Sequence, residues 1–106
     1  MKRGEIYWAE LGPPAGRRPV VVLSRNAAIP VLSGVVVAPI TTSVRKIASE
    51  VELGRANGLS EPSAATCDNI LTVPNTIIDG TLVGALSVGQ TVKLDRALRF
   101  ALEIAY

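Results

Sequence analysis

The sequence predicts a mainly β fold with one α-helix, a small and strongly curved antiparallel sheet or barrel that is closed by the helix. Two observations lead to this prediction. Short apolar segments with many β-forming side chains recur along residues 4–86, and clusters of glycine and proline separate them. The final segment, from residue 87, instead begins with a helix-capping signal and continues with apolar residues at helical spacing.

The first half of the chain predicts four strands. Residues 4–11 are rich in β-formers, and the glycines and prolines of residues 12–16 end this strand. Residues 19–24 predict an apolar strand that begins with Pro19, where a missing N–H costs least. A loop over 26–34 leads to a buried strand over 35–41, in which Pro39 implies a bulge or a sheet edge. A polar, basic turn over 42–47 precedes a half-exposed, alternating strand over 49–53.

The second half predicts two more strands and the helix. After an irregular segment over 54–62, residues 64–73 predict a strand that Asp68 and Asn69 interrupt. Residues 74–79 predict a short helical turn, and residues 81–86 another strand. Ser87 and Gln90 have the S-x-x-Q spacing of a capping box, which opens a helix. Its apolar positions share one face, which should pack on the sheet: Leu94, Leu98, Ala101, Leu102 and Ala105.

Composition excludes several classes of protein and of site. With 106 residues, of which 48% are apolar and 19% charged, the chain is too apolar for disorder and fits one domain over residues 1–106. A single cysteine cannot close an internal disulfide. The absence of histidine excludes cysteine–histidine metal sites and the catalytic triads that need an imidazole base. We therefore expect a reduced domain that uses no metal and no cofactor.

No segment reaches the roughly 20 consecutive apolar residues of a membrane helix. The basic start of the chain is not followed by an apolar signal segment, because Glu5 and Glu10 interrupt it. We expect a cytoplasmic protein without a membrane partner.

The net charge of +2 hides an asymmetry between the two parts of the chain. Residues 1–46 hold seven cations and two acids, whereas residues 47–106 hold four cations and seven acids. Eight of the eleven cations are arginine, whose planar guanidinium suits phosphate. A basic half of this kind favours a polyanionic partner, although ordinary solvated charge explains it equally well.

Two strand ends carry the candidate phosphate-binding residues. Arg17 and Arg18 stand at the mouth of the strand over 19–24, and Thr41 stands at the end of the strand over 35–41. If these strands form an antiparallel pair, Arg18 and Thr41 lie side by side and can bind one phosphate. The alternative is that the arginines protect a strand end from aggregation and that the hydroxyls are ordinary turn residues. Further hydroxyls and cations follow Thr41 in the chain: Thr42, Ser43, Arg45 and Lys46.

Asp68 and Asn69 are candidates for reading the edges of nucleobases, because a carboxylate accepts from amines and an amide both donates and accepts. An Asx turn or a bulge explains the same pair as structure. The neighbouring Cys67 is expected to be a buried, small apolar residue. Tyr7 and Trp8 alternate on one strand, so one should face the core and the other solvent. For Trp8 we expect a place in the core or in a dimer contact rather than a base-stacking role.

Six segments, in this order, carry a resemblance that spans essentially the whole chain: residues 2–8 (KRGEIYW), 11–14 (LGPP), 17–24 (RRPVVVLS), 38–42 (APITT), 68–73 (DNILTV) and 83–87 (VGALS). Together they resemble the MazF/PemK-type toxins. The resemblance implies an SH3-like β-barrel of the CcdB/MazF kind, a two-fold homodimer and metal-independent cleavage of single-stranded RNA by the adjacent 2′-hydroxyl. It also implies 2′,3′-cyclic phosphate and 5′-hydroxyl ends, and a cognate antitoxin whose flexible tail covers the same groove.

The resemblance assigns roles to single residues. The arginine that precedes the proline, Arg18, and the threonine that ends the apolar strand, Thr41, are implied to be catalytic. Arg3 is implied to contact RNA, and Asp68 with Asn69 to read bases. One departure stands out, because the loop over 13–16 lacks the carboxylate that many members carry before the R-P motif. Either Arg18 handles the proton as well as the charge, or activity is weak.

Two other functions are compatible with the sequence. Related barrel toxins that resemble CcdB bind DNA gyrase instead of cutting RNA, and would not need the pair Arg18 and Thr41. A domain that binds RNA but no longer cleaves it would account for the missing loop carboxylate, and predicts salt-sensitive binding without a cyclic-phosphate product.

Overall fold

The computed structural model describes residues 1–105, which fold into seven strands, three short 3₁₀ helices and one α-helix. The strands are β1 (Glu5–Glu10), β2 (Arg17–Val22), β3 (Gly34–Thr41), β4 (Glu50–Leu53), β5 (Ser63–Thr66), β6 (Leu71–Pro74) and β7 (Ile78–Ala85). The 3₁₀ helices are η1 (Arg55–Asn57), η2 (Cys67–Asn69) and η3 (Asn75–Ile77), and the α-helix is α1 (Val88–Leu102).

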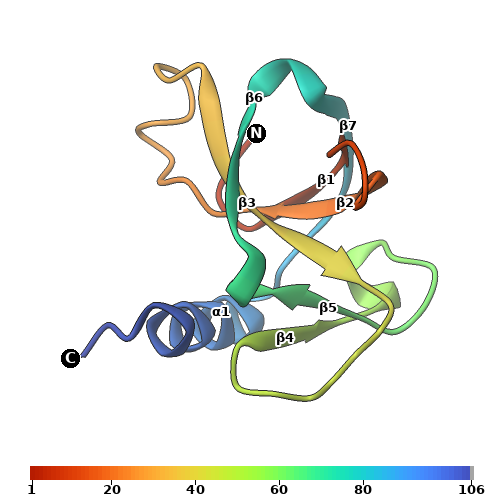
Figure 1. The fold of residues 1–106 in the computed structure, drawn as a ribbon, viewed down its shortest axis with the longest axis vertical. Helices are drawn as coiled ribbons and strands as arrows, with labels where there is room; N and C mark the ends of the chain where they lie inside the picture. Colours follow the sequence, from red (N-terminus) through yellow and green to blue (C-terminus); the bar gives the residue numbers. More distant parts are fainter. Residues whose placement is uncertain (106) are drawn as a thin grey trace.

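All the strand pairs are antiparallel, and the sheet is strongly curved (Figure 1). The strand order is β4-β5-β3-β2-β1-β7, with β6 as a further partner of β3. Within the described chain the end strands β4 and β7 do not pair, so the sheet does not close into a complete barrel. The mainly β fold with a C-terminal helix that the sequence predicts is confirmed.

Strand β3 changes its partner along its length. Its first half pairs with β6, from Gly34 to Val37, and its last two residues pair with β5. Pro39 falls between the two partners, and its carbonyl accepts a hydrogen bond from Thr66 Oγ1 at 2.8 Å. Since the N–H and C=O of one strand residue point to the same side, the missing N–H of Pro39 falls where neither partner needs it. The bulge or sheet edge expected at Pro39 is therefore wrong, because β3 lies inside the sheet in regular register with β2, and Pro39 is accommodated at the local gap between β6 and β5.

The single strand expected over residues 64–73 is in fact two strands. Residues 63–66 form β5 and residues 71–74 form β6, and η2 turns the chain between them at the polar interruption. The separation has a physical reason, because β5 and β6 pair with opposite ends of β3. The short helical turn expected over 74–79 is confirmed as η3.

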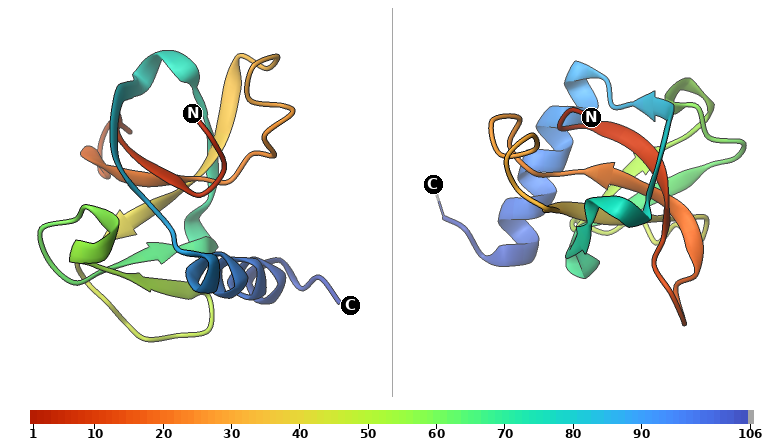
Figure 2. Two further views of the ribbon diagram at one scale, coloured as in Figure 1. Left: turned by 180° about the vertical axis from the view of Figure 1, so that it is seen from behind. Right: turned by 90° about the horizontal axis from the view of Figure 1, so that it is seen from above.

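The helix α1 begins as its capping signal predicts and packs against β4 and η2 (Figure 2). Ser87 Oγ accepts from the backbone N–H of Gln90, and the Gln90 side chain accepts from the N–H of Ser87. The face that the helix buries differs from the expected one at its C-terminal end. Leu94 and Ala97 are fully buried, whereas Leu102 is 51% exposed because the helix ends there, and Ala105 lies beyond it.

Two apolar clusters fill the two faces of the curved sheet. Ile6, Val21 and Ile40 belong to the cluster beneath α1, and Tyr7, Val20 and Val37 belong to the other. The alternation expected for Tyr7 and Trp8 is confirmed, with Tyr7 in the core. A core position for Trp8 is wrong, because the residue is 38% exposed, and the alternative place in a dimer contact stays a prediction. Among the helices that the structure describes, none is long and apolar enough to cross a membrane.

Candidate active site

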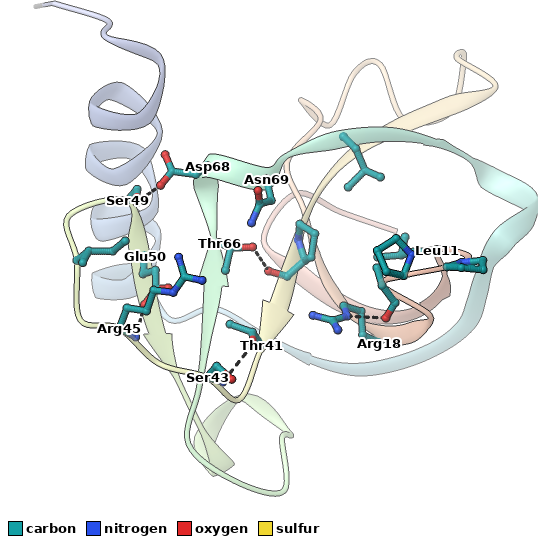
Figure 3. A pocket seen from close by; sticks show the side chains of 16 residues that line it. Leu11, Arg18, Thr41, Ser43, Arg45, Ser49, Glu50, Thr66, Asp68 and Asn69 are labelled. Carbon is teal, nitrogen blue, oxygen red and sulfur yellow. Dashed lines mark hydrogen bonds between the residues drawn. The ribbon is translucent and has the colours of Figure 1, made fainter.

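A pocket of about 540 Å³ opens where the start of β2, the end of β3, η2 and the loop over 12–16 meet (Figure 3). Arg18 lies on one side, Arg45, Glu50 and Asp68 lie on the other, and Thr41 lies between them. Six residues that the sequence singled out line this pocket: Arg18, Thr41, Ser43, Arg45, Asp68 and Asn69.

The register of β2 and β3 explains why Arg18 and Thr41 meet. The last residues paired between these strands are Val20 and Pro39, and Arg18 and Thr41 each lie two residues farther along. Side chains at every second position of a strand share a face of the sheet, so Arg18 lies on the same face as Val20, and Thr41 on the same face as Val37. Val20 and Val37 belong to one apolar cluster, so Arg18 and Thr41 lie on the same face. The expected antiparallel pairing of the two strands is confirmed, and it brings both side chains to one pocket.

The loop between β1 and β2 holds the guanidinium of Arg18. Arg18 Nε donates to the carbonyl of Ala15 at 3.1 Å. The loop closes tightly because Gly12 and Gly16 adopt positive φ, at 75° and 68°, and Leu11 donates to Gly16 across it. Within residues 1–105 no carboxylate pairs with Arg18, so its two terminal nitrogens are available to an anion.

Thr41 is positioned by its own turn. Its Oγ1 accepts from the backbone N–H of Ser43 at 3.1 Å, which leaves the hydroxyl proton for a ligand. Ser43 is itself exposed at the rim of the pocket. A hydroxyl donor and a guanidinium thus face the same space, an arrangement that suits a phosphate.

The 3₁₀ helix η2 presents Asp68 and Asn69 on the opposite wall. Ser49 Oγ donates to Asp68 Oδ2 at 2.5 Å, and the backbone N–H of Cys67 donates to the carbonyl of Ser49. The polar interruption is therefore a helical turn rather than a bulge, and it leaves both Asp68 and Asn69 exposed. A base-reading role for the pair stays a prediction.

Some lining residues were not singled out by sequence reasoning. Glu50 is one of them, and its Oε1 accepts from the backbone N–H of Arg45 at 2.9 Å. With Glu50 included, the pocket holds two guanidinium groups and two carboxylates. The place of Glu50 depends on how β4 folds back beside η2, for which the sequence carries no local signal. An apolar wall completes the pocket: Leu11, Pro13, Pro14, Ala15, Pro39, Ile47 and Leu71.

Two of the predicted arginines have other partners. Arg3 Nη2 forms an ion pair with Asp95 on α1 at 3.0 Å, and its Nε donates to the carbonyl of Leu23. Arg17 forms ion pairs with Glu10 at 3.2 Å and with Asp79 at 3.4 Å. Hydrogen bonds from Thr81, and then from Arg17, lower the pKa of the Asp79 carboxyl below its ordinary value. Neither Arg3 nor Arg17 lines the pocket.

Thr42 and Lys46 do not line it either. Thr42 points to the other face of the sheet, where it borders a second pocket. Lys46 is exposed and adopts a positive φ of 57° in the turn after β3.

The thiol next to the pocket is not activated. Burial, and to a smaller extent the charge of Asp68, raises the pKa of Cys67 to about 11. Cys67 is 1% exposed, which confirms the expected buried, apolar role. In the described part of the chain, no three residues among Asp, Glu, Cys and His gather closely enough to hold a metal ion.

Comparison with known proteins gives concordant results in sequence and structure. Residues 2–102 match the family described as PemK-like, MazF-like toxin of type II toxin-antitoxin system. Endoribonuclease MazF3 of Mycobacterium tuberculosis is 42% identical over 88 residues, which cover 82% of this chain and 84% of MazF3. The probable endoribonuclease MazF5 of the same organism is 42% identical over 104 residues, which cover 97% and 90% of the two chains.

Solved structures agree with these matches. The Mycobacterium tuberculosis toxin MazF-mt6 superposes with a TM-score of 0.89 at 38% identity, over 96% of this chain and 99% of that one. A mycobacterial endoribonuclease in complex with its cognate antitoxin superposes with a TM-score of 0.88 at 28% identity, over 100% and 98% of the two chains.

Proposed function

The chain belongs to the PemK-like, MazF-like toxins of type II toxin–antitoxin systems, and on this premise we propose that it is a sequence-selective endoribonuclease that cleaves single-stranded RNA. The observation that supports the proposal most directly is the shared pocket of Arg18 and Thr41. A relative named as an endoribonuclease aligns with 97% of the chain, and so across both residues.

RNA supplies the nucleophile in this reaction. The 2′-oxygen forms a bond to the adjacent phosphorus, the bond from phosphorus to the 5′-oxygen breaks, and 2′,3′-cyclic phosphate and 5′-hydroxyl ends result. The proton of the 2′-hydroxyl passes to a base, and the 5′-oxygen takes up a proton as it leaves. The protein has to hold the phosphate in line and stabilise the charge that develops on its oxygens, and neither task needs histidine or a metal.

The two side chains divide this work. Arg18 binds the non-bridging oxygens through the terminal nitrogens that its bond to Ala15 leaves available. The hydroxyl of Thr41 donates a hydrogen bond to the same phosphate, because its oxygen already accepts one from the backbone N–H of Ser43. The side chains of Asp68 and Glu50 line the same pocket and take the place of the missing loop carboxylate as candidate proton acceptors.

The remaining lining residues would bind the rest of the RNA. Asp68 and Asn69 would read base edges against the apolar wall of the pocket, and Ser43 and Arg45 would contact neighbouring phosphates. Arg3, Arg17, Thr42 and Lys46 lie outside the pocket and stay predictions as contacts for flanking RNA.

The proposal includes two protein partners. One is a cognate antitoxin, as in the mycobacterial relative whose structure contains one, and its flexible tail would cover the pocket. The other is a second copy of the chain, which light scattering would detect as twice the 11.1 kDa mass. The proposed substrate includes mRNA, as a single-stranded RNA, so the proposed place of the activity is the cytoplasm.

The test is cleavage of a long single-stranded RNA, mapped by primer extension and analysed for cyclic-phosphate ends. Arg18→Ala and Thr41→Ala should each lower the cleavage rate about 100-fold or more, as expected when a donor to the developing charge is lost. In the same assay, Asp68→Asn and Glu50→Gln identify the proton acceptor, because only loss of that carboxylate should lower the cleavage rate while RNA binding is kept.

Arg96→Ala is the matched control, since Arg96 is an exposed arginine on α1 outside the pocket. This variant should cleave at the wild-type rate. Full activity of Arg18→Ala or Thr41→Ala would rule out this site. If the wild-type protein binds RNA in a salt-sensitive way but does not cleave it, the protein is an RNA-binding domain and not a nuclease. If RNA stays intact while DNA gyrase is stalled, the protein is a gyrase inhibitor.

A further inference from the structure

A second pocket, of about 270 Å³, adjoins the proposed active site at the end of β3. Trp8, Pro19, Ile40 and Glu61 are among its lining residues, and it shares Thr41 with the first pocket. The loop between η1 and β5 forms its rim, beside the tip of the β3 arrow in Figure 1.

The two pockets lie on opposite faces of the sheet. Trp8 shares a face of β1 with Ile6, and Ile6 and Ile40 both belong to the cluster beneath α1. Arg18 and Thr41 belong to the other face, with Val20 and Val37. The end of β3 at Thr41 is therefore the edge between the pockets, around which a flexible chain could pass from one to the other.

The second pocket offers an aromatic ring and a carboxylate. Trp8 is 38% exposed, and the guanidinium of Arg17 lies 5.4 Å from the centre of its ring, which restrains the orientation of the ring. The carboxylate of Glu61 forms no hydrogen bond or ion pair with any residue from 1 to 105. The backbone beside it is fixed, because Ser63 Oγ donates to the carbonyl of Glu61 at 2.9 Å.

We propose that this second pocket is a specificity subsite that takes one RNA base next to the scissile phosphate, stacked against Trp8 and held by Glu61. The inference rests on the proposed endoribonuclease function. Because Thr41 lines both pockets, a base in the second pocket belongs to a nucleotide that adjoins the phosphate at Thr41. Stacking on an aromatic ring tolerates any base, so selection comes from the carboxylate.

The carboxylate determines which bases fit. A carboxylate accepts a hydrogen bond from the exocyclic amine of adenine, cytosine or guanine. Uracil has no amine, and two carbonyl oxygens flank its single N–H, so they would repel Glu61. The subsite therefore selects amine-bearing bases over uracil.

Trp8 is the single tryptophan of the chain, so its fluorescence reports on this pocket alone. The probe is a short RNA around a cut site mapped for the wild-type protein, with one 2′-deoxyribose at the attacking position to prevent cleavage. Its binding should quench the fluorescence, and removal of one base beside the cut should abolish the quenching and weaken binding about tenfold. The anisotropy of a dye on the same RNA measures binding separately.

Sequencing of the cut sites in a randomised RNA tests selection. Glu61→Gln should keep cleaving and lose its preference against uracil at that one position, because an amide can also donate to a carbonyl. Glu103→Gln, at the end of α1 and outside the pocket, is the matched control and should keep the wild-type preference.

The outcomes separate this inference from the function on which it rests. The subsite alone is overturned if the wild-type protein binds and cuts RNA, but the RNA leaves Trp8 fluorescence unchanged and Glu61→Gln leaves the base preference unchanged. Quenching by the antitoxin or by self-association, but not by RNA, also overturns it in favour of a protein contact. A wild-type protein that neither binds nor cuts RNA overturns the proposed function, and the subsite with it.

Discussion

Arg17 and Arg18 are adjacent in the sequence, but their side chains lie on opposite faces of β2 and differ in whether a carboxylate pairs with them. Arg17 points to the face of β2 where Trp8 lies, and its charge is paired with Glu10 and Asp79. Arg18 points to the other face, where a backbone carbonyl holds it and no carboxylate of residues 1–105 pairs with it. Alternation along one strand thus separates a structural arginine from one that is available to a ligand.

Cys67 makes stability depend on pH at the alkaline end. Because the pKa of the folded thiol is raised from 9.0 to about 11, the folded state keeps a proton that the unfolded chain loses first. The free energy of unfolding should therefore fall as pH rises from 9 to 11, by at most about 2–3 kcal/mol. Below pH 9 the thiol is protonated in both the folded and the unfolded state, so this loss of stability is absent there.

Urea denaturation at pH 8 and at pH 10.5 measures this loss. Cys67→Ala is the reference, since it removes the thiol and should show a correspondingly smaller fall over the same pH range. An equal fall in both proteins would mean that other groups cause it.

At the scale of elements, the loop at η1 is joined to β7 by a close contact between two backbones. A Cβ added at Gly84 would overlap the backbone carbonyl of Asn57, and one added at Gly58 would overlap that of Val83. The side chain of Asn57 completes the junction, because its Nδ2 donates to the carbonyl of Ala85 at 3.0 Å and to Gln90 Oε1 at 2.6 Å. The capping glutamine of α1 therefore also holds the loop that bounds the second pocket.

Gly84→Ala should destabilise the protein by more than about 2 kcal/mol, because neither backbone can withdraw without breaking this junction. Gly80→Ala is the control on the same strand, since nothing lies within 4 Å of a Cβ placed there, and should change stability by less than about 1 kcal/mol. Thermal unfolding followed by circular dichroism compares the two. Similar melting temperatures would show that the contact is loose in solution.

For the whole molecule, the proposed chemistry depends on fixed charges and not on a bound ion. Arg18 already provides a positive charge where the phosphate would lie, and the RNA provides its own nucleophile. Cleavage should therefore proceed at the same rate, within about twofold, with excess EDTA and with millimolar Mg²⁺. A metal-dependent nuclease in the same buffers is the control, and loss of cleavage in EDTA would contradict the proposal.

Local patterns in the sequence are sufficient for much of this protein. Alternation and breakers predicted the strands, the S-x-x-Q spacing predicted the start of α1, and the facing ends of two apolar strands predicted that Arg18 and Thr41 would meet. Each of these features depends on neighbours in sequence or on one hairpin-like pairing, so a single sequence is enough to infer it.

Only the tertiary structure decided the rest. Strand β3 changes its partner along its length, which divides one expected strand into β5 and β6. The fold also brings Glu50 to the candidate site and places Trp8 beside a second pocket instead of in the core. Arg3 forms an ion pair with Asp95 on α1, which is distant in the sequence. These placements depend on the curvature of the whole sheet, which many weak contacts between remote segments set together, and no local pattern in the chain encodes it.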